Sequence, residues 1–184
     1  MGLWIVLTLI VLLVVYVILT FNGLVAKRNR VKNAWSQIDV QLKRRHDLIP
    51  NLMNAVKGYL QHEREVLENV TRARQQAIAA GGDITARATA ENMLTQAMRS
   101  LFAVAEAYPE LKSSQNMLAF QEELSSTENK ISFARQFYND AVMEYNTACE
   151  SFPGNLIAGN LGFLHETVFT LDDATERAVP SVQF

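Results

Sequence analysis

Residues 114–152, SQNMLAFQEELSSTENKISFARQFYNDAVMEYNTACESF, decide the fold. One series of positions in this stretch, taken at alternating steps of three and four residues, is apolar except at its fourth member: Met117, Phe120, Leu124, Thr127, Ile131, Ala134, Tyr138, Ala141, Tyr145, Ala148 and Phe152. This spacing places the series on one face of an α-helix, in the pattern of helices that pack along their length. The stretch therefore predicts one long helix that buries this face against other helices.

A second series with the same spacing runs from Val31 to Ala77 and is interrupted only by Arg45 and Glu63. It also predicts helix, because strands show a two-residue alternation instead. We expect Glu63 either to pair with an arginine of a neighbouring helix, which would fix the register between the two helices, or to lie at a solvent-exposed edge.

The ends of the predicted helices are marked by residues with special backbone preferences. Gly81 and Gly82 follow the second series and are typical of a helix carboxyl end. Asp83 is suited to cap the next helix, and Pro109 cannot continue that helix. Long helices joined by such short connections lie antiparallel. We therefore predict an all-α fold in which residues 47–152 form an antiparallel bundle of long helices.

Pro50 lies within the second series and is the main obstacle to one continuous helix. In a helix interior, proline loses a backbone hydrogen bond and clashes with the carbonyl four residues earlier, at a cost of about 3 kcal/mol. The cost largely disappears if Asp47 is the N-cap, because the first turn of a helix has no intrahelical partner for its N–H groups. We therefore expect a helix joint at Asp47 and Pro50, where one helix ends near Arg45 and a bundle helix from Asp47 to Ala80 begins.

The segment Leu3–Phe21 contains 19 residues and no charge. At about 1.5 Å per residue, a helix of this length crosses a bilayer core of about 30 Å. A cleaved signal peptide would instead need a basic amino-terminal segment and small residues at the cleavage site, which this segment lacks. We predict a transmembrane anchor in residues 1–22, a juxtamembrane basic helix in residues 23–46, and an apolar tail with glycine and proline in residues 153–184.

Charge is unevenly distributed along the chain. Residues 1–45 carry a net charge of +6 and the remainder carries −8. Cations directly after the span favour a cytoplasmic bundle with the amino terminus outside, and they attract anionic lipid headgroups. The acidic remainder argues against nucleic-acid binding. The predicted membrane-surface residues are Lys27, Arg28, Arg30, Lys32, Lys43, Arg44 and Arg45.

Little in the sequence indicates catalysis. His62-Glu63 and His165-Glu166 begin like the zinc motif HExxH, but its second histidine is missing in both places. Cys149 has no histidine near it in the sequence and is expected to be an ordinary helical residue. We expect no enzymatic activity, no cofactor and no metal.

Several apolar residues are available for contacts beyond a simple bundle. Phe133 and Phe137 lie off the apolar series and serve either the core or an oligomer contact. The tail is too apolar to remain in water, so it packs on its own bundle or on a neighbouring chain. The candidate oligomer or partner contacts are Phe133, Phe137, Phe152, Phe163, Val182 and Phe184.

Five stretches carry a resemblance to a known family: FNGLVAKRNRVKNAWSQIDVQLKRRHDLIPNLMNAVKGYLQHE, VTRAR, AYPELKSSQNMLAFQEELSSTENKISFARQFYNDAVMEYN, FPGN and the ending VPSVQF. Through them the chain resembles the LemA family of bacterial inner-membrane proteins along nearly its whole length. The resemblance implies a single amino-terminal span, an α-helical cytoplasmic bundle and no established enzymatic activity. It also implies partners in membrane proteostasis or envelope stress, and relatives in magnetosome membranes.

These features lead to a functional expectation with one alternative. We expect a non-enzymatic, membrane-anchored helical scaffold or adaptor that self-associates at the bacterial inner membrane and helps to shape or organise it in envelope stress. Its expected partners are the lipid bilayer and further copies of the chain. The alternative is an adaptor that regulates a membrane-embedded protease through the acidic bundle face or the tail.

Overall fold

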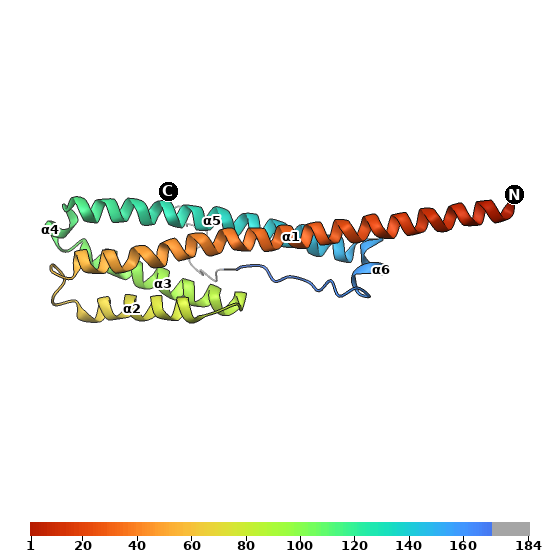
Figure 1. Cartoon of the computed structure of the whole chain (residues 1–184). Coiled ribbons are helices and arrows are strands. Elements are labelled where there is room, and N and C mark those ends of the chain that lie inside the picture. Colours follow the sequence, from red (N-terminus) through yellow and green to blue (C-terminus); the bar gives the residue numbers. More distant parts are fainter. Residues whose placement is uncertain (171–184) are drawn as a thin grey trace, which may run out of the picture. The chain divides into compact units, whose positions relative to one another are not determined.

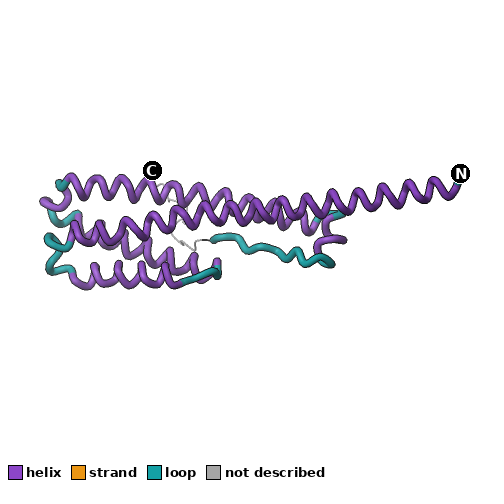
Figure 2. The backbone as a smooth tube through the Cα atoms, viewed as in Figure 1, coloured by secondary structure: helices purple, strands orange, loops and turns teal. Residues whose placement is uncertain are grey.

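The computed structural model describes residues 1–170 and shows the all-α fold that the sequence predicts. No strand occurs among these residues. Figure 2 shows the helices connected by short loops, with a non-helical segment after the last of them. The helices, labelled in Figure 1, are α1 (Gly2–Val56), α2 (Arg64–Ala79), α3 (Ile84–Ala105), α4 (Pro109–Lys112), α5 (Gln115–Glu150) and α6 (Gly154–Ala158).

The described residues form two compact units, and each is described separately. Unit 1 consists of residues 1–39 and 132–168. Unit 2 consists of residues 40–131 together with residues 169 and 170. The two longest helices, α1 and α5, each contribute to both units.

Unit 2 has an apolar core. Figure 1 shows α2 and α3 lying side by side as an antiparallel pair, and the parts of α1 and α5 in this unit complete the core. Each buried leucine or isoleucine side chain stabilises the fold by about 1.5–3 kcal/mol relative to an exposed position. The best-buried members of this core are Ile49, Leu52, Val56, Leu60, Val70, Leu94, Leu101, Leu111 and Met117.

The helix boundaries expected around Gly81, Asp83 and Pro109 in unit 2 are confirmed. α2 ends at Ala79, and Gly81 has a φ of +65°, a left-handed backbone conformation that glycine adopts without strain. The Asp83 carboxylate caps α3 by accepting hydrogen bonds from the backbone N–H groups of Thr85 at 2.8 Å and Ala86 at 3.0 Å. Pro109 follows the end of α3 and begins the short helix α4.

The expected joint at Asp47 and Pro50 is wrong, because α1 continues through both residues to Val56. Pro50 lies inside the helix and its side chain faces solvent. The carbonyl of His46 would normally accept the N–H of residue 50. It accepts a hydrogen bond from Nε of Arg74 instead, at 2.7 Å, so a side chain from α2 replaces the bond that proline cannot make.

The helix breaks further along, at residues 57–63, rather than at Pro50. Gly58 lies in this connection, and glycine is a poor helix former. The apolar series from Val31 to Ala77 therefore runs across two helices, with Ile49 and Val56 buried before the turn and Val70 and Ala77 buried after it.

Unit 1 is built on an antiparallel pairing of α1 and α5. The rings of Trp35 and Tyr138 pack with their centroids 5.4 Å apart, and Lys27 forms an ion pair with Glu144. The buried residues that the two helices contribute to this unit include Leu24, Val31, Ala34, Ile38, Ala141, Val142, Tyr145 and Cys149.

The segment after α6 packs along α5 within unit 1. Tyr138 Oη donates a hydrogen bond to the carbonyl of Thr167 at 2.8 Å, and Tyr145 Oη donates to the carbonyl of Leu164 at 2.9 Å. The side chain of Asn146 makes two hydrogen bonds with the backbone of Glu166. Its Nδ2 donates to the Glu166 carbonyl, and its Oδ1 accepts from the Glu166 N–H. This part of the tail therefore packs on its own chain.

Within the described residues, α1 is the one helix long and apolar enough to cross a membrane. The apolar window near its amino end is not buried against the rest of the chain. The hydroxyls of Thr8 and Thr20 each donate to the carbonyl four residues earlier, at 2.9 Å, so neither hydroxyl proton lacks a partner. Internal bonding of this kind is what a helix needs in lipid.

Candidate functional site

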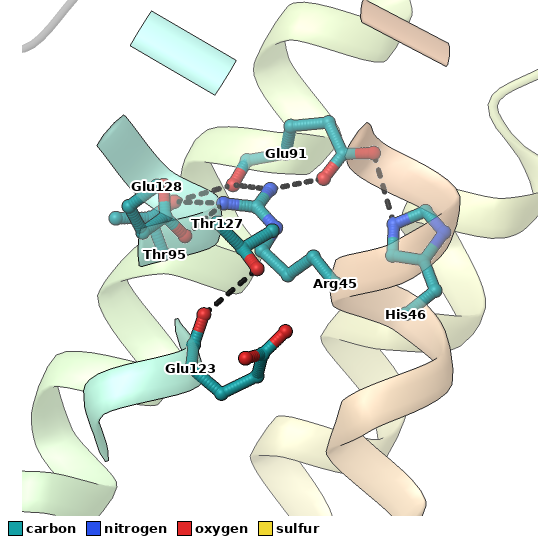
Figure 3. Close-up of polar contacts among 7 residues, drawn as sticks. All are labelled: Arg45, His46, Glu91, Thr95, Glu123, Thr127 and Glu128. Atoms are coloured by element: carbon teal, nitrogen blue, oxygen red, sulfur yellow. Dashed lines mark hydrogen bonds and ion pairs between the residues drawn. The ribbon is translucent and has the colours of Figure 1, made fainter. Parts of the chain in front are cut away.

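The most elaborate polar arrangement in unit 2 is centred on Arg45 (Figure 3). The Arg45 side chain is 3% exposed and forms ion pairs with Glu91 of α3 and Glu128 of α5. It also donates a hydrogen bond to Thr95 Oγ1 at 3.1 Å. His46 Nε2 lies 3.0 Å from the second carboxylate oxygen of Glu91. We call these five residues the polar cluster.

The charges of the polar cluster stabilise one another. Burial alone would lower the pKa of Arg45, but the carboxylates of Glu128 and Glu91 outweigh it and raise the pKa above its usual value. Burial alone would raise the pKa of Glu91, but the contacts with His46 and Arg45 hold that pKa below its usual value. Both Arg45 and Glu91 are therefore charged in the folded protein at neutral pH.

This arrangement suits the positioning of helices better than catalysis. A buried charge without its partner is strongly unfavourable, so α1, α3 and α5 must be in the register that brings Arg45, Glu91 and Glu128 together.

Arg45 was expected at the membrane surface, and that expectation is wrong, since the residue is buried within unit 2. The membrane-surface roles of Lys43, which is exposed, and Arg44, which pairs with Glu123, stay predictions.

An open cleft of about 590 Å³ lies beside α2 and the end of α1. Its lining includes Lys57, Arg64, Glu68 and Arg72 and contains neither histidine nor cysteine. Within residues 1–170, no group of three or more histidine, cysteine, aspartate or glutamate side chains is placed to hold a metal ion. The cleft therefore offers mainly charged and polar side chains, which suit weak binding at the surface.

Glu63 is partly exposed, as expected for an edge of the bundle, and its partner among the described residues is a tyrosine rather than an arginine. Its carboxylate accepts a hydrogen bond from Tyr108 Oη at 3.1 Å, and this bond raises the pKa of Tyr108. The contact links the turn before α2 to the end of α3.

In unit 1, the first four predicted membrane-surface residues form what we call the basic collar: Lys27, Arg28, Arg30 and Lys32. Lys27 and Arg30 both pair with Glu144, the latter at 2.9 Å. The Lys27 hydrogen bond is the main cause that holds the pKa of Glu144 below its usual range. One carboxylate therefore offsets part of the collar's positive charge.

The aromatic contact candidates differ in exposure. Phe133 and Phe152 are 73% and 76% exposed, and Phe137 is 37% exposed with the Arg30 guanidinium 5.6 Å from its ring centre. Phe163 is only 5% exposed. Its ring is therefore not available to another chain, contrary to the prediction. Val182 and Phe184 lie outside the described residues.

Sequence reasoning missed the partners of Arg45, namely Glu91 and Glu128, and the roles of Arg74 and Glu144. Part of this could have been inferred, because an arginine on an otherwise apolar helix face needs a buried carboxylate nearby. Glu91 lies directly after Ala90 on the predicted packing face of its helix. Nothing in the spacing indicated Arg74, since its acceptor is a backbone carbonyl.

Comparisons with known proteins identify the family of this chain. The sequence model described as the LemA family matches residues 34–184. The chain is 28% identical over 148 residues to Protein LemA of Metamycoplasma hominis, an alignment that covers 80% of this chain and 68% of that protein. It is 23% identical over 199 aligned positions to the Magnetosome proteins MamQ 1 and MamQ 2 of Paramagnetospirillum magneticum, covering 95% of this chain and 73% of each relative.

Proposed function

Since this chain belongs to the LemA family, we propose that it is a non-enzymatic helical scaffold that one helix anchors in the bacterial inner membrane. The observation that supports this most directly is the continuity of α1. The apolar run Leu3–Phe21 and the buried residues that follow it, from Leu24 to Val56, belong to a single helix of 55 residues. The segment that would lie in lipid and the residues that α1 buries in each unit therefore belong to the same helix.

The proposed orientation places the bundle in the cytoplasm. All four residues of the basic collar follow the apolar run, and Met1 and Gly2 before that run have no charged side chain. Positively charged flanks remain on the cytoplasmic side of bacterial membranes. Protease treatment of intact spheroplasts should leave the bundle undegraded, whereas the same treatment of inverted membrane vesicles should degrade it; the reverse pattern would contradict this orientation.

The scaffold is proposed to act by self-association. Phe133 and Phe137 are four residues apart on α5, so they share one face of the helix, and both are exposed. Exposed apolar side chains that adjoin one another mark interaction surfaces more often than isolated ones. A second copy of the chain is the proposed partner for this face.

Two measurements on the full chain test this proposal. Membrane association is tested by fractionation of cells that express the chain with or without residues 2–22; the full chain should sediment with membranes and the shortened chain should not. Self-association is tested by mass photometry in detergent. Phe133→Ser should shift the assemblies toward single chains, whereas Leu118→Ser, which changes another exposed residue of α5, should not. A full chain that is monomeric throughout would overturn self-association and leave the anchoring intact.

A further inference from the structure

The carboxyl end of α5 lies level with the end of the apolar run of α1. The two helices are antiparallel in unit 1, and Lys27 pairs with Glu144. Each residue from Lys27 toward the amino end of α1 therefore matches one residue from Glu144 toward the carboxyl end of α5. Six residues in each direction lead to Phe21 and Glu150, the last residues of the apolar run Leu3–Phe21 and of α5.

Direct contacts show that the chain following α5 lies beside the same part of α1, near Phe21. The ring of Phe163 packs edge-on against the ring of Phe21, with centroids 5.6 Å apart. The Arg28 guanidinium lies 5.0 Å from the centre of the same Phe163 ring. Figure 1 shows α6 beside α1 at the point where α1 continues without a neighbouring helix toward its amino end.

The segment between α5 and Phe163 has the composition of a lipid-contacting surface. Residues 152–164, which we call the α6 segment, contain no charged residue. Phe163 is buried, but four large apolar residues of the segment are mainly exposed: Phe152 (76%), Leu156 (62%), Leu161 (53%) and Leu164 (80%). The polar groups at its edges are Glu150 and His165, whose Oε1 and Nε2 atoms lie 3.5 Å apart, and the basic collar of α1.

We propose that the α6 segment is a second membrane contact, which inserts its exposed apolar side chains into the headgroup region of the same bilayer leaflet from which α1 emerges. This inference rests on the proposed anchoring of α1. Lipid is the occupant favoured by position, because Phe163 holds the segment against Phe21, where the apolar run leaves the bilayer core. Charge also favours lipid, since the basic collar lies at the same level and attracts anionic headgroups.

The α6 segment can reach this position because of one glycine. Gly154 is buried, and a Cβ atom at this position would lie 2.0 Å from the carbonyl oxygen of Ala148. Glycine therefore lets the chain fold back directly against the last turn of α5. Without this close approach, α6 would have to move away from α5 and from the level of Phe21.

The proposal is tested with single-tryptophan variants of the full chain in vesicles of phosphatidylethanolamine and phosphatidylglycerol. The chain contains two tryptophans, Trp4 and Trp35. Both are replaced by phenylalanine, and one tryptophan is then introduced by Phe152→Trp or by Phe133→Trp. These two positions are nearly equally exposed, but Phe133 lies more than four turns of α5 before Glu150, which makes it the matched control.

The readout is quenching by phosphatidylcholine that carries a nitroxide near the top of its acyl chain. Because aromatic rings at the membrane surface lie at the headgroup level, we expect about a twofold loss of fluorescence for Phe152→Trp and little change for Phe133→Trp. Leu161→Trp in the same background should be quenched like Phe152→Trp. Equal helicity by circular dichroism establishes that the variants are folded.

A separate variant reports on the span itself: both native tryptophans are replaced by phenylalanine and Leu12→Trp places one tryptophan at the middle of the apolar run Leu3–Phe21. If Leu12→Trp is quenched by lipid carrying the nitroxide deep in its acyl chain but Phe152→Trp and Leu161→Trp are not quenched by the shallow nitroxide, the α6 inference is overturned and the anchoring stands. If Leu12→Trp is not quenched, the anchoring fails and the inference fails with it. Protection of the introduced tryptophans from aqueous iodide without lipid quenching would show that another copy of the chain covers the segment, which also overturns the inference. If Phe133→Trp is quenched as strongly as Phe152→Trp, the α6 segment is not closer to the bilayer than the middle of α5, and the inference is overturned.

Discussion

The hydrogen bond between Arg74 and the carbonyl of His46 should matter only because residue 50 is proline. Arg74→Met keeps the aliphatic length of the side chain and removes the donor. Hydrogen bonds that involve a charged group contribute about 1.5–3 kcal/mol, and His46 is only 7% exposed, so water cannot readily replace the lost donor. We therefore expect Arg74→Met to lower the free energy of unfolding by about 1.5–3 kcal/mol.

The same substitution should cost less in a Pro50→Ala background. Alanine at this position restores an N–H that donates to the His46 carbonyl within α1, so the acceptor keeps a partner when Arg74 is replaced. Pro50→Ala alone should also stabilise the chain, by up to the roughly 3 kcal/mol that proline costs in a helix interior. The coupling between the two substitutions should be at least about 1 kcal/mol, well beyond the additivity error for independent sites.

Urea unfolding of the full chain in a mild detergent, followed by far-ultraviolet circular dichroism, measures all four members of this cycle. Arg72→Met is the control, because Arg72 is an exposed residue of α2 and has a 3.4 Å contact with Asn69. It should change the free energy of unfolding by less than about 0.5 kcal/mol. An equal cost of Arg74→Met in the proline and alanine backgrounds would refute the compensation argument.

Four further predictions follow from the contacts described. Arg45→Met should lower the free energy of unfolding by about 3–5 kcal/mol because it leaves the Glu91 carboxylate buried, whereas adding Glu91→Leu should recover most of that loss in the same unfolding measurement. Because the folded-state pKa of Glu91 lies below its usual 4.5, the stability that its charge contributes is present above that pH and is lost as the pH falls through the folded value; Glu91→Gln should show a shallower loss of unfolding midpoint in acid. Gly154→Ala should lower the thermal unfolding midpoint through its clash with Ala148, while Gly159→Ala, at a position with no atom within 4 Å, should not. Asp83→Ala removes the α3 cap and should cost about 1 kcal/mol in urea unfolding, and Asp83→Asn, which retains a capping oxygen, should cost less.

The sequence predicts the helices and their buried faces well because both depend on local spacing. The cap at Asp83, the stop at Pro109 and the long helix α5 all follow from preferences within a few residues. The break predicted at Pro50 is wrong because the cost of a proline in a helix depends on contacts from outside that helix. Arg74, far along the chain on α2, supplies the missing donor, and no local pattern reports such a contact.

The partners in the polar cluster could not be predicted from local sequence either, because they come from three different helices. The position of Arg45 on an apolar face indicates that the residue is unusual, but its charge alone predicts a place at the membrane surface. Its burial depends on carboxylates from α3 and α5 that meet it only after folding. The packing of the tail on α5 likewise depends on backbone carbonyls as acceptors for Tyr138 and Tyr145. Every residue carries such a carbonyl, so the acceptor leaves no distinctive sequence signal.

The pairing of Lys27 with Glu144 limits how the proposed anchor can adapt to bilayers of different thickness. A free transmembrane helix relieves hydrophobic mismatch by tilting or by shifting along the bilayer normal. In unit 1, a shift of α1 relative to α5 would separate Lys27 from Glu144 and Phe21 from Phe163. A thinner or thicker membrane must therefore be accommodated by tilting α1 together with the rest of unit 1 or by deforming the surrounding lipid.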